Sequence, residues 1–272
     1  MLVPVILLFL QAQYWHGEAG VVKPMSSTKN AKLIGGHDIA ISDAPYQVSL
    51  HFSGEYLCSA VLVDVDIVLT AAFCFKNISR NPAHYKIRVG SNSIDEGGWL
   101  HDVKKIVIHP RYHLAATFNI ALVKTASVFS QEVTPVIKVG SIPMMEPGEE
   151  VPDGANVQVT GWGLTQEYTW PKVLQMIEVQ TVNWQTCVYE FDPFVITKEM
   201  MCAGVAEPDK TGFYKGDSGA PLVYNGKLAG LSNYYFWQPG VQEFFYPTQS
   251  YTKVSAFRNW IAETIQNMTS HF

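Results

Sequence analysis

Positive charge and long apolar runs are both scarce in this chain of 272 residues. Its 24 acidic residues outnumber 19 basic ones, which gives a formal net charge of −5. A slightly negative protein does not attract nucleic acid or anionic lipid electrostatically, so we expect neither as a partner. No stretch after the N-terminal residues approaches the ~20 apolar residues of a membrane-spanning helix. With 47% hydrophobic and 16% charged residues, the chain can bury one large or two small cores, and we expect a globular protein.

The N-terminal apolar run, residues 2–10, is short and has no Lys or Arg before it. It is too short to cross a bilayer comfortably, and the following Gly17, Glu18 and Ala19 end in a small residue that suits signal-peptide cleavage. We therefore predict a secretory signal peptide over residues 1–19 and an extracellular protein that is not anchored in a membrane. Because the basic segment that usually precedes such a run is weak, a buried hydrophobic segment is the alternative interpretation.

Cysteine is sparse, with four residues in the whole chain. Four cysteines in a secreted protein allow three pairings, and the spacing favours Cys58 with Cys74 and Cys187 with Cys202. Each bond would close a loop of about fifteen residues and stabilise the fold by roughly 3 kcal/mol in the loop-entropy model. Free buried thiols, the alternative, are not favoured outside the cytosol.

Helical periodicity is missing until the last residues. From residue 45 onward, short apolar runs rich in Val, Ile and Tyr are separated by Gly, Pro, Asn and Asp, a pattern typical of an all-β protein. The expected strands are residues 46–50, 67–70, 85–89, 120–123, 157–160, 174–179 and 228–231. Residues 142–148 are dense in Pro and Gly, so we place a boundary between two barrels there. Phe257, Trp260, Ile261 and Ile265 stand at helical spacing and predict an amphipathic C-terminal helix.

Six short motifs follow one another along the chain. They are Leu-Ile-Gly-Gly at 33–36, Ala-Ala-x-Cys at 71–74, Thr-Gly-Trp-Gly at 160–163, Met-Cys-Ala-Gly at 201–204, Gly-Asp-Ser-Gly at 216–219 and Tyr-Thr-Lys-Val at 251–254. In this order they resemble the chymotrypsin/trypsin family of serine proteases over essentially the whole chain from Leu33. The resemblance implies an all-β fold of two six-stranded antiparallel Greek-key barrels with a C-terminal helix. It also implies these boundaries: a propeptide at 20–32, a domain at 33–272, barrels at about 33–142 and 150–253, and a helix at about 254–267.

The activation residues of the family are present. The resemblance implies cleavage after Lys32 and insertion of the new α-amino group of Leu33 beside Asp217. That ion pair would order the turn whose amides, those of Gly216 and Ser218, form an oxyanion hole. Losing one partner of such a buried pair typically costs about 3 to 5 kcal/mol. The alternative is an uncleaved bond after Lys32 and an Asp217 that only caps a turn.

Two of the three catalytic side chains of the family are missing. By the resemblance Ser218 stands at the nucleophile, but Phe73 stands at the histidine and Asn119 at the aspartate. A serine attacks an acyl carbon only if a base takes its proton, and a phenyl ring has no lone pair to do so. In trypsin the change of the aspartate to asparagine costs about ten-thousandfold in turnover. In subtilisin the loss of the histidine costs about a millionfold, or about 8 kcal/mol of barrier, so we expect no proteolysis.

Few groups could replace the missing base. Lys215, three residues before Ser218, could form a serine–lysine dyad, and His109 and His113 lie near Asn119 in the sequence. The resemblance places Lys215 at the rim of the substrate pocket, facing solvent, and surface or loop polarity is the simpler interpretation of all three residues. The two histidines have no third ligand at suitable spacing, so we expect no metal site, and no cofactor either.

The substrate pocket of the family is altered as well. Tyr214 stands where active members have a disulfide cysteine, and Gly212 stands where trypsin specificity requires an aspartate. Tyr234 and Gln249 align with glycines of the pocket wall, and Ser-Asn-Tyr at 232–234 replaces the family's Ser-Trp-Gly. Bulky side chains at these positions should fill the pocket.

Beside the pocket, seven aromatic residues lie within residues 234–246. They could pack in the core or form an exposed recognition patch of the kind enriched in protein interfaces. The sequence leaves both open, because a hydrophobic run does not reveal which face it presents. Two glycosylation sequons, at Asn77 and Asn267, agree with secretion, with chance occurrence as the alternative.

We interpret the chain as a secreted serine protease homologue that has lost proteolysis and acts by binding another protein. The replacements at Phe73, Asn119 and Tyr214 resemble those of the inactivated serine protease paralogues of scabies mites, relatives of the mite group 3 allergens. That resemblance implies secretion toward a host and interference with complement components. The alternatives are a hydrolase that uses Ser218 with a non-standard base and a cofactor or decoy in an endogenous protease cascade. We expect a monomer.

Overall fold

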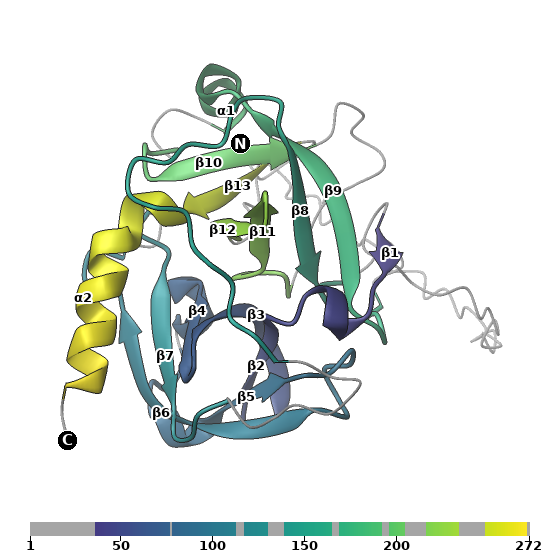
Figure 1. Ribbon diagram of the computed structural model, residues 1–272, viewed down its shortest axis with the longest axis vertical. Helices are drawn as coiled ribbons and strands as arrows, with labels where there is room; N and C mark the ends of the chain where they lie inside the picture. The colour runs from purple at the N-terminus through teal and green to yellow at the C-terminus, as the bar shows by residue number, and fades with distance from the viewer. Residues whose placement is uncertain are drawn as a thin grey trace, which may run out of the picture.

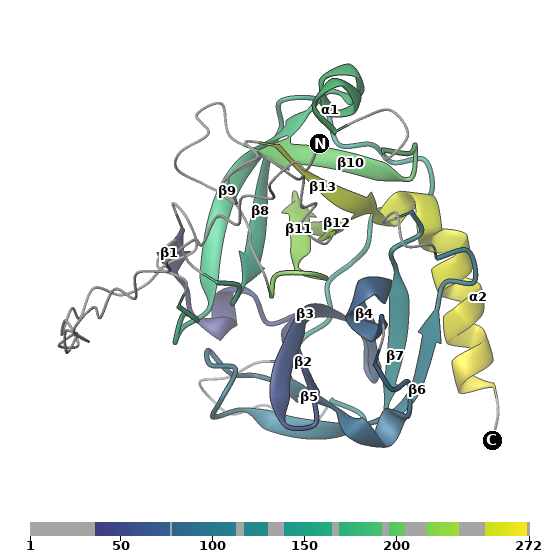
Figure 2. The ribbon, with the colours of Figure 1, turned by 180° about the vertical axis from the view of Figure 1, so that it is seen from behind.

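The computed structural model describes residues 36–76, 78–112, 117–129, 139–164, 169–191, 196–204, 216–233 and 248–270. Within them the chain forms two β-barrels, one above the other in Figure 1, with the helix α2 (Arg258–Thr269) along one flank of both. The reverse view in Figure 2 shows α2 leaving the second barrel at the end of β13 and running beside β6 and β7 of the first. The predicted signal peptide and propeptide, and Leu33, lie outside the described residues.

The first barrel is closed by six antiparallel strands in the order β2-β3-β4-β7-β6-β5. Its strands are β2 (Gln47–Phe52), β3 (Glu55–Asp64), β4 (Ile67–Thr70), β5 (Tyr85–Val89), β6 (Trp99–Ile108) and β7 (Ala121–Thr125). Closure comes from the pairing of β2 with β5, in which Val48 lies opposite Val89. Three short 3-10 turns flank these strands: η1 (Ile41–Asp43), η2 (Ala72–Phe75) and η3 (Pro82–His84).

The second barrel is closed by the pairing of β8 with β9, while β1 (His37–Asp38) extends the sheet outside β9. Its strands are β8 (Asn156–Gly161), β9 (Gln175–Val182), β10 (Met200–Gly204), β11 (Pro221–Tyr224), β12 (Lys227–Ser232) and β13 (Thr248–Lys253). The predicted fold class, two six-stranded antiparallel barrels with a C-terminal helix, is therefore confirmed.

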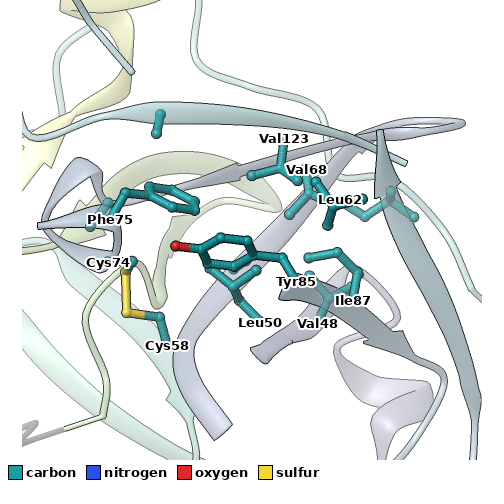
Figure 3. Packing of buried hydrophobic residues seen from close by; sticks show 14 of the residues in the cluster. Val48, Leu50, Cys58, Leu62, Val68, Cys74, Phe75, Tyr85, Ile87 and Val123 are labelled. Atoms are coloured by element: carbon teal, nitrogen blue, oxygen red, sulfur yellow. A yellow bond between two sulfur atoms is a disulfide. The ribbon is translucent and has the colours of Figure 1, made fainter. Parts of the chain in front are cut away.

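Alternating strand residues fill each barrel. In β5 the side chains of Tyr85, Ile87 and Val89 are buried, whereas Lys86 between them is exposed, because successive residues of a strand point to opposite faces. Figure 3 shows the Tyr85 ring among aliphatic side chains of the first barrel, and its centroid lies 5.3 Å from that of Phe75. Beside this core lies the disulfide between Cys58 and Cys74. The second predicted pair, Cys187–Cys202, is also present.

Residues 139–153, here called the strap, connect the barrels and lie against the second one. Main-chain hydrogen bonds join it to Leu228 of β12, whose amide donates to Pro143 (2.8 Å) and whose carbonyl accepts from Met145 (3.1 Å). Three ion pairs hold its acidic side chains: Glu146–Arg258 at 3.4 Å, Glu149–Lys227 at 2.7 Å and Glu150–Lys253 at 2.7 Å. The segment that we predicted as a linker from its prolines and glycines is thus fixed to the second barrel by both main chain and side chains.

Two helical features differ from the sequence-based expectations. The C-terminal helix was expected at about 254–267, but residues 254–257 form the 3-10 turn η4 (Val254–Phe257), and α2 extends to Thr269. A second helix, α1 (Trp184–Phe191), was not predicted. Its first turn is capped by Asn183, whose side-chain oxygen accepts a hydrogen bond from the amide of Thr186 at 2.9 Å, a common way to begin a helix.

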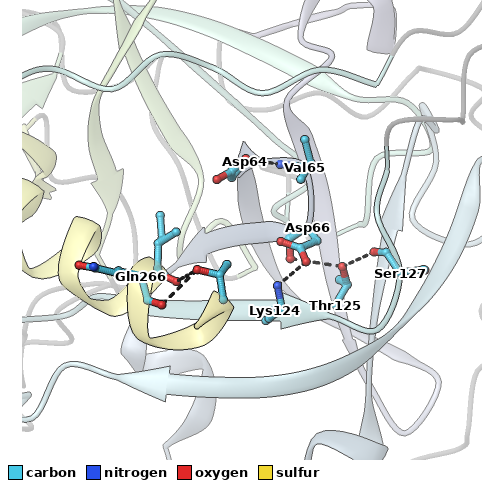
Figure 4. A network of polar contacts seen from close by, with 9 residues as sticks. Asp64, Val65, Asp66, Lys124, Thr125, Ser127 and Gln266 are labelled. Atoms are coloured by element: carbon cyan, nitrogen blue, oxygen red, sulfur yellow. Dashed lines mark hydrogen bonds and ion pairs between the residues drawn. The ribbon is translucent and has the colours of Figure 1, made fainter. Parts of the chain in front are cut away.

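A nearly buried ion pair fixes the edge of the first barrel near α2. Figure 4 shows Lys124 of β7 bonded to Asp66 in the turn between β3 and β4. The hydroxyl of Thr125 extends the contact by donating to the carbonyl of Ser127 at 2.7 Å. Burial of a charge is tolerated here because each charge has a direct partner.

Candidate functional site

The predicted nucleophile turn, Gly216 to Gly219, precedes β11 at the junction of the two barrels. A side chain at Gly219 (φ +81°) would overlap the hydroxyl of Thr70 and the carbonyl of Ser59, both from the first barrel. The turn is closed by a hydrogen bond from the amide of Ala220 to the carbonyl of Asp217, at 2.8 Å. Glycine is required at 219 by this close approach, and the turn is thereby pressed against the first barrel.

Asp217 is buried, with 1% of its surface exposed. Its carboxylate accepts a hydrogen bond from the amide of Gly163 at 2.8 Å, and a side chain at Gly161 or Gly163 would overlap that carboxylate. The glycines of the Thr-Gly-Trp-Gly motif thus make room for the acidic group. Leu33, the predicted partner of Asp217, lies outside the described residues, so that pair stays a prediction.

The negative charge of Asp217 acts on two buried tyrosines. Burial is the main cause that raises the pKa of both Tyr56 and Tyr251, and the nearby carboxylate raises it further. Both phenols therefore stay protonated and do not act as bases.

Phe73 lies in η2, directly after β4, and its ring packs partly buried against the core of the first barrel. Its amide donates a hydrogen bond of 2.8 Å to the side-chain oxygen of Asn119, which is fully buried. Ser218 lies next to the same turn, because its carbonyl oxygen is 3.9 Å from the Sγ atom of Cys74. The fold therefore brings the three predicted triad positions to one place between the barrels.

The amide of Asn119 belongs to a buried polar network that sequence reasoning missed. Its Nδ2 atom donates to the side-chain oxygen of Asn233 at 3.1 Å, and the same oxygen accepts from the hydroxyl of Thr252 at 2.8 Å. The Nδ2 atom of Asn233 donates in turn to the hydroxyl of Ser250 at 3.2 Å. Each of these hydrogen bonds joins neutral groups, so an amide at position 119 suits its surroundings better than a carboxylate.

Ser232, the first residue of the segment that replaces the family's Ser-Trp-Gly, is bonded to the nucleophile turn. Its hydroxyl donates to the carbonyl of Asp217 and accepts from the amide of Ala220, at 3.0 Å for the latter. The next residue, Asn233, is the one that this segment presents to Asn119. The signal that could have revealed this contact is a second polar residue, Asn233, directly after Ser232.

His109, which we considered as a substitute base, is part of an aromatic cluster at the start of α2. Its ring stacks on Phe118 at 5.0 Å and contacts Phe257 and Trp260 at 5.4 and 4.8 Å between centroids. Its Nδ1 atom accepts a hydrogen bond from the amide of Arg111 at 3.2 Å. Burial, and secondarily the charge of Arg111, lower the pKa of His109, so a neutral packing role explains this histidine. His113 and Lys215 lie outside the described residues.

A serine–histidine contact away from the triad positions was not anticipated. In β2 the hydroxyl of Ser49 lies 2.9 Å from the Nε2 atom of His51, and both residues are buried. Burial, and to a lesser extent the charge of Arg88, lower the pKa of His51 to about 4. The imidazole is therefore neutral at physiological pH, but a peptide bond could not approach a hydroxyl enclosed within a barrel wall.

Two aromatic residues that sequence reasoning also missed contact Gly216, whose amide the resemblance assigns to the oxyanion hole. The hydroxyl of Tyr56 donates to the carbonyl of Gly216 at 2.8 Å. Trp170 packs edge-on to Tyr56, with 5.5 Å between centroids, and its ring lies where a side chain at Gly216 (φ +101°) would point. Trp170 remains 43% exposed, so its indole forms part of the surface beside Ser218.

Of the predicted pocket residues, only Gln249 is described; it is partly buried in β13, opposite Ala203 of β10. Gly212, Tyr214 and Tyr234, with the rest of residues 234–246, lie outside the described residues, and so does Asn77 of the first sequon. Asn267 of the second sequon is exposed in α2.

A search of the described residues for metal sites and membrane spans gives no candidate. They contain no group of three or more His, Cys, Asp or Glu side chains placed to hold a metal ion. The helices among them include none that is long and apolar enough to span a membrane.

Comparison with known proteins agrees with the motifs. The Trypsin family matches residues 33–261. The chain is 39% identical over 250 residues to a vitellin-degrading protease of Bombyx mori and 35% identical over 245 residues to a trypsin of Phaedon cochleariae. These alignments cover 90% of both chains in the first case, and 88% of this chain and 90% of the relative in the second.

Among solved structures, the scabies mite inactivated protease paralogue S-D1 superposes with a TM-score of 0.76. The match covers 86% of this chain and 98% of the other, at 23% identity, so this likeness supports the fold alone. On its family match and its curated relatives, the chain belongs to the trypsin family of serine proteases and their homologues.

Proposed function

We propose that this protein is a secreted, non-catalytic member of the trypsin family that acts by binding another protein. The observation that carries the proposal is the occupation of the base and aspartate positions. Phe73 offers a phenyl ring where proton transfer needs a lone pair, and Asn119 is held by neutral hydrogen bonds on both sides of its amide. Ser218 then has no base at the family position from which to become a nucleophile.

These changes should remove most of the catalytic power of a trypsin-like site. In related triads, loss of the histidine costs about a millionfold in turnover, which corresponds to about 8 kcal/mol of barrier. Such a protein would keep the binding surfaces of a protease without consuming its partner.

Active-site labelling tests the loss of catalysis. The purified protein, with cleavage at Leu33 verified by N-terminal sequencing, would be treated with a fluorophosphonate serine probe beside the Ser218→Ala variant. We expect no labelling of the parent above the Ser218→Ala control. Labelling that depends on Ser218 would contradict the proposal and make Lys215 the next residue to replace.

Complement is the partner system that we propose, since the resemblance to the mite paralogues implies it and the fold matches one of them. Lysis of antibody-coated erythrocytes by serum should fall with increasing protein, and Ser218→Ala should inhibit equally, because binding needs no nucleophile. Unchanged lysis at high protein concentration would exclude complement. Inhibition by the parent but not by Ser218→Ala would instead favour an enzyme.

A hydrolase with a non-standard base is the second candidate. The nucleophile turn is well formed, with Asp217 buried and bonded to Gly163, and the relatives include proteins named as proteases and trypsins. Turnover of a broad peptide library that disappears in Ser218→Ala would establish this alternative.

Secretion is proposed on the N-terminal segment and the two disulfides. Expression in a eukaryotic secretory host should deliver the protein to the medium, with a new N-terminus at or after residue 20. Retention of residues 1–19 in the mature protein would contradict the signal-peptide assignment.

A further inference from the structure

A surface hollow of about 110 Å³ lies on the second barrel, between the strap, α1 and the strands β9, β10 and β13. In Figure 1 the strap passes α2 and β10 and reaches α1 before it enters β8. We call this feature the acidic hollow and define it by its lining residues: Met145, Glu149, Glu150, Val151, Asp153, Thr181, Val182, Trp184, Cys187, Met200, Met201, Cys202, Ala229, Lys253 and Ser255. None of them belongs to the triad positions or to the nucleophile turn.

The lining of the acidic hollow includes adaptable apolar side chains. Three of them are methionines, of which Met145 and Met200 are buried and Met201 is partly buried. Trp184 at the start of α1 stands at its edge and is 39% exposed. Thioether side chains adapt to flexible apolar groups, and an exposed indole can hold a cation over its face. The lining therefore suits a long aliphatic side chain that ends in a positive charge.

The rim carries an excess of negative charge. Glu149, Glu150 and Asp153 line it, against the single ammonium group of Lys253. Lys253 is already engaged by Glu150 at 2.7 Å, and Glu149 is paired with Lys227 outside the hollow. The exposed carboxylate of Asp153 makes no ion pair within the described part of the chain. One carboxylate at the mouth is thus free to receive a cation.

We propose that the acidic hollow receives a lysine or arginine side chain of the protein partner. This inference rests on the proposed function only in assuming that a protein partner exists. The methylene stem would lie on the methionines and Trp184, and the cationic end would remain at the mouth near Asp153. Long basic side chains commonly bury the stem while keeping the charge in contact with water. Such an anchor uses a surface away from the degenerate triad.

Methyl NMR of the purified protein, labelled at the methionine methyl groups, tests the inference with defined probes. The probes are the capped tripeptides acetyl-Gly-Lys-Gly-amide and acetyl-Gly-Arg-Gly-amide, with norleucine and glutamate analogues as controls. We expect shifts of Met145, Met200 and Met201 with the basic peptides, at a Kd of about 1 to 10 mM for a single side chain. Met268, buried near the end of α2, should not shift.

Matched variants separate the acidic hollow from general charge and aromatic effects. Asp153→Asn should weaken binding by about three- to fivefold, whereas Asp95→Asn, which removes an exposed carboxylate near the first barrel, should not. Trp184→Ala should weaken binding by about fivefold. Tyr189→Ala removes an 89% exposed aromatic group from the same helix, but one outside the hollow, and should leave binding unchanged.

Three results would overturn the inference. One is the absence of methionine shifts with either basic peptide. The second is equal binding of the norleucine peptide, which would make the hollow a simple apolar site. The third is a change of the methionine methyl shifts with protein concentration when no peptide is present, which would assign the acidic hollow to contact with a second copy of this chain. None of these would decide the proposed function, which the labelling and lysis experiments test separately.

Discussion

Replacing Asn119 by aspartate exchanges one buried NH₂ group for an oxygen, and we expect this change to destabilise the protein, most strongly above neutral pH. The exchanged atom now donates to the side-chain oxygen of Asn233 at 3.1 Å. A carboxylate oxygen would face that acceptor without a proton between them. The lost hydrogen bond costs about 1 kcal/mol, and leaving a buried charged group unsatisfied costs about 2 kcal/mol more. The expected loss is therefore about 3 kcal/mol.

Protonation limits this cost at lower pH. A protonated carboxyl group can donate to Asn233 as the amide does, so the folded state favours the neutral form and raises the pKa of the introduced carboxyl group above its unfolded value of about 3.9. Keeping that group protonated costs about 1.5 kcal/mol at pH 5 but about 5 to 6 kcal/mol at pH 8. The neutral form therefore stabilises the variant at low pH, and this contribution is lost as the pH rises from the unfolded pKa through the raised one.

Chemical unfolding with intact disulfides, followed by tryptophan fluorescence at pH 5 and pH 8, checks this expectation. Asn119→Asp should lose about 3 kcal/mol of unfolding free energy at pH 8, because the charged carboxylate is then the form of lower free energy in the folded state. It should lose about half of that at pH 5, where the protonated carboxyl group has the lower free energy. Asn156→Asp is the control, because its side chain is exposed at the start of β8, and it should change stability little at either pH. An Asn119→Asp variant as stable as the parent at both pH values would refute the account of the network.

The same network predicts that restoring two triad residues is insufficient for catalysis. In Phe73→His with Asn119→Asp, the carboxylate would still face the side-chain oxygen of Asn233 unless that amide turned over. Turning it over would break its present hydrogen bonds with the hydroxyls of Thr252 and Ser250. Adding Asn233→Ser supplies a hydroxyl that can donate to the carboxylate. We expect fluorophosphonate labelling at Ser218 to be at least about tenfold faster in the triple variant, since each 1.36 kcal/mol is worth tenfold in rate. Equal labelling of the double and triple variants would mean that Asn233 does not limit reactivation.

Two further predictions concern stability in the two barrels. The guanidinium group of Arg88 donates to the carbonyls of Ile94, Asp95 and Gly97 at 3.1, 3.0 and 2.5 Å. Arg88→Met should therefore lower the free energy of unfolding in urea by about 2 kcal/mol. The control Lys86→Met, at an exposed position, should lower it by less than about 1 kcal/mol. Gly163→Ala should cost more than about 2 kcal/mol, because its methyl group would overlap the Asp217 carboxylate. At Gly140 a methyl group would meet nothing closer than 4.0 Å, so Gly140→Ala should stay within about 0.5 kcal/mol. A stable Gly163→Ala variant would mean that Asp217 can move away.

Seven of the twelve barrel strands, β2, β4, β5, β7, β8, β9 and β12, were predicted from short apolar runs bounded by turn residues. Alternate burial is visible in strands such as β5 and β9, whereas β4 is buried throughout. The disulfide pairs followed from spacing for a similar reason, since each closes a short loop. The helix α1 was missed because eight residues give barely two turns, too few for a periodic pattern, although Asn183 at its start was a usable signal.

The contacts that define the candidate site could not be derived from local pattern. Asn119 and Asn233 are 114 residues apart, and Tyr56 and Gly216 are 160 apart. These contacts exist only because barrel closure and strand register bring the segments together, and a shift by one residue turns a side chain to the other face. That is why aligning residues 232–234 with the family's Ser-Trp-Gly did not reveal that Asn233 bonds to Asn119.

The retained nucleophile motif is explained by packing as well as by chemistry. Gly219 fits against Thr70 and Ser59 of the first barrel, and Asp217 is enclosed by the glycines at 161 and 163. A side chain at Gly219 would overlap the first barrel, and a methyl group at Gly161 or Gly163 would overlap the Asp217 carboxylate, so packing alone constrains these glycines. At the base position, the partly buried ring of Phe73 packs against the core of one barrel, so the fold accommodates an apolar side chain there. A chain of this fold can therefore lose its base while keeping its serine turn, and the turn alone does not identify an enzyme.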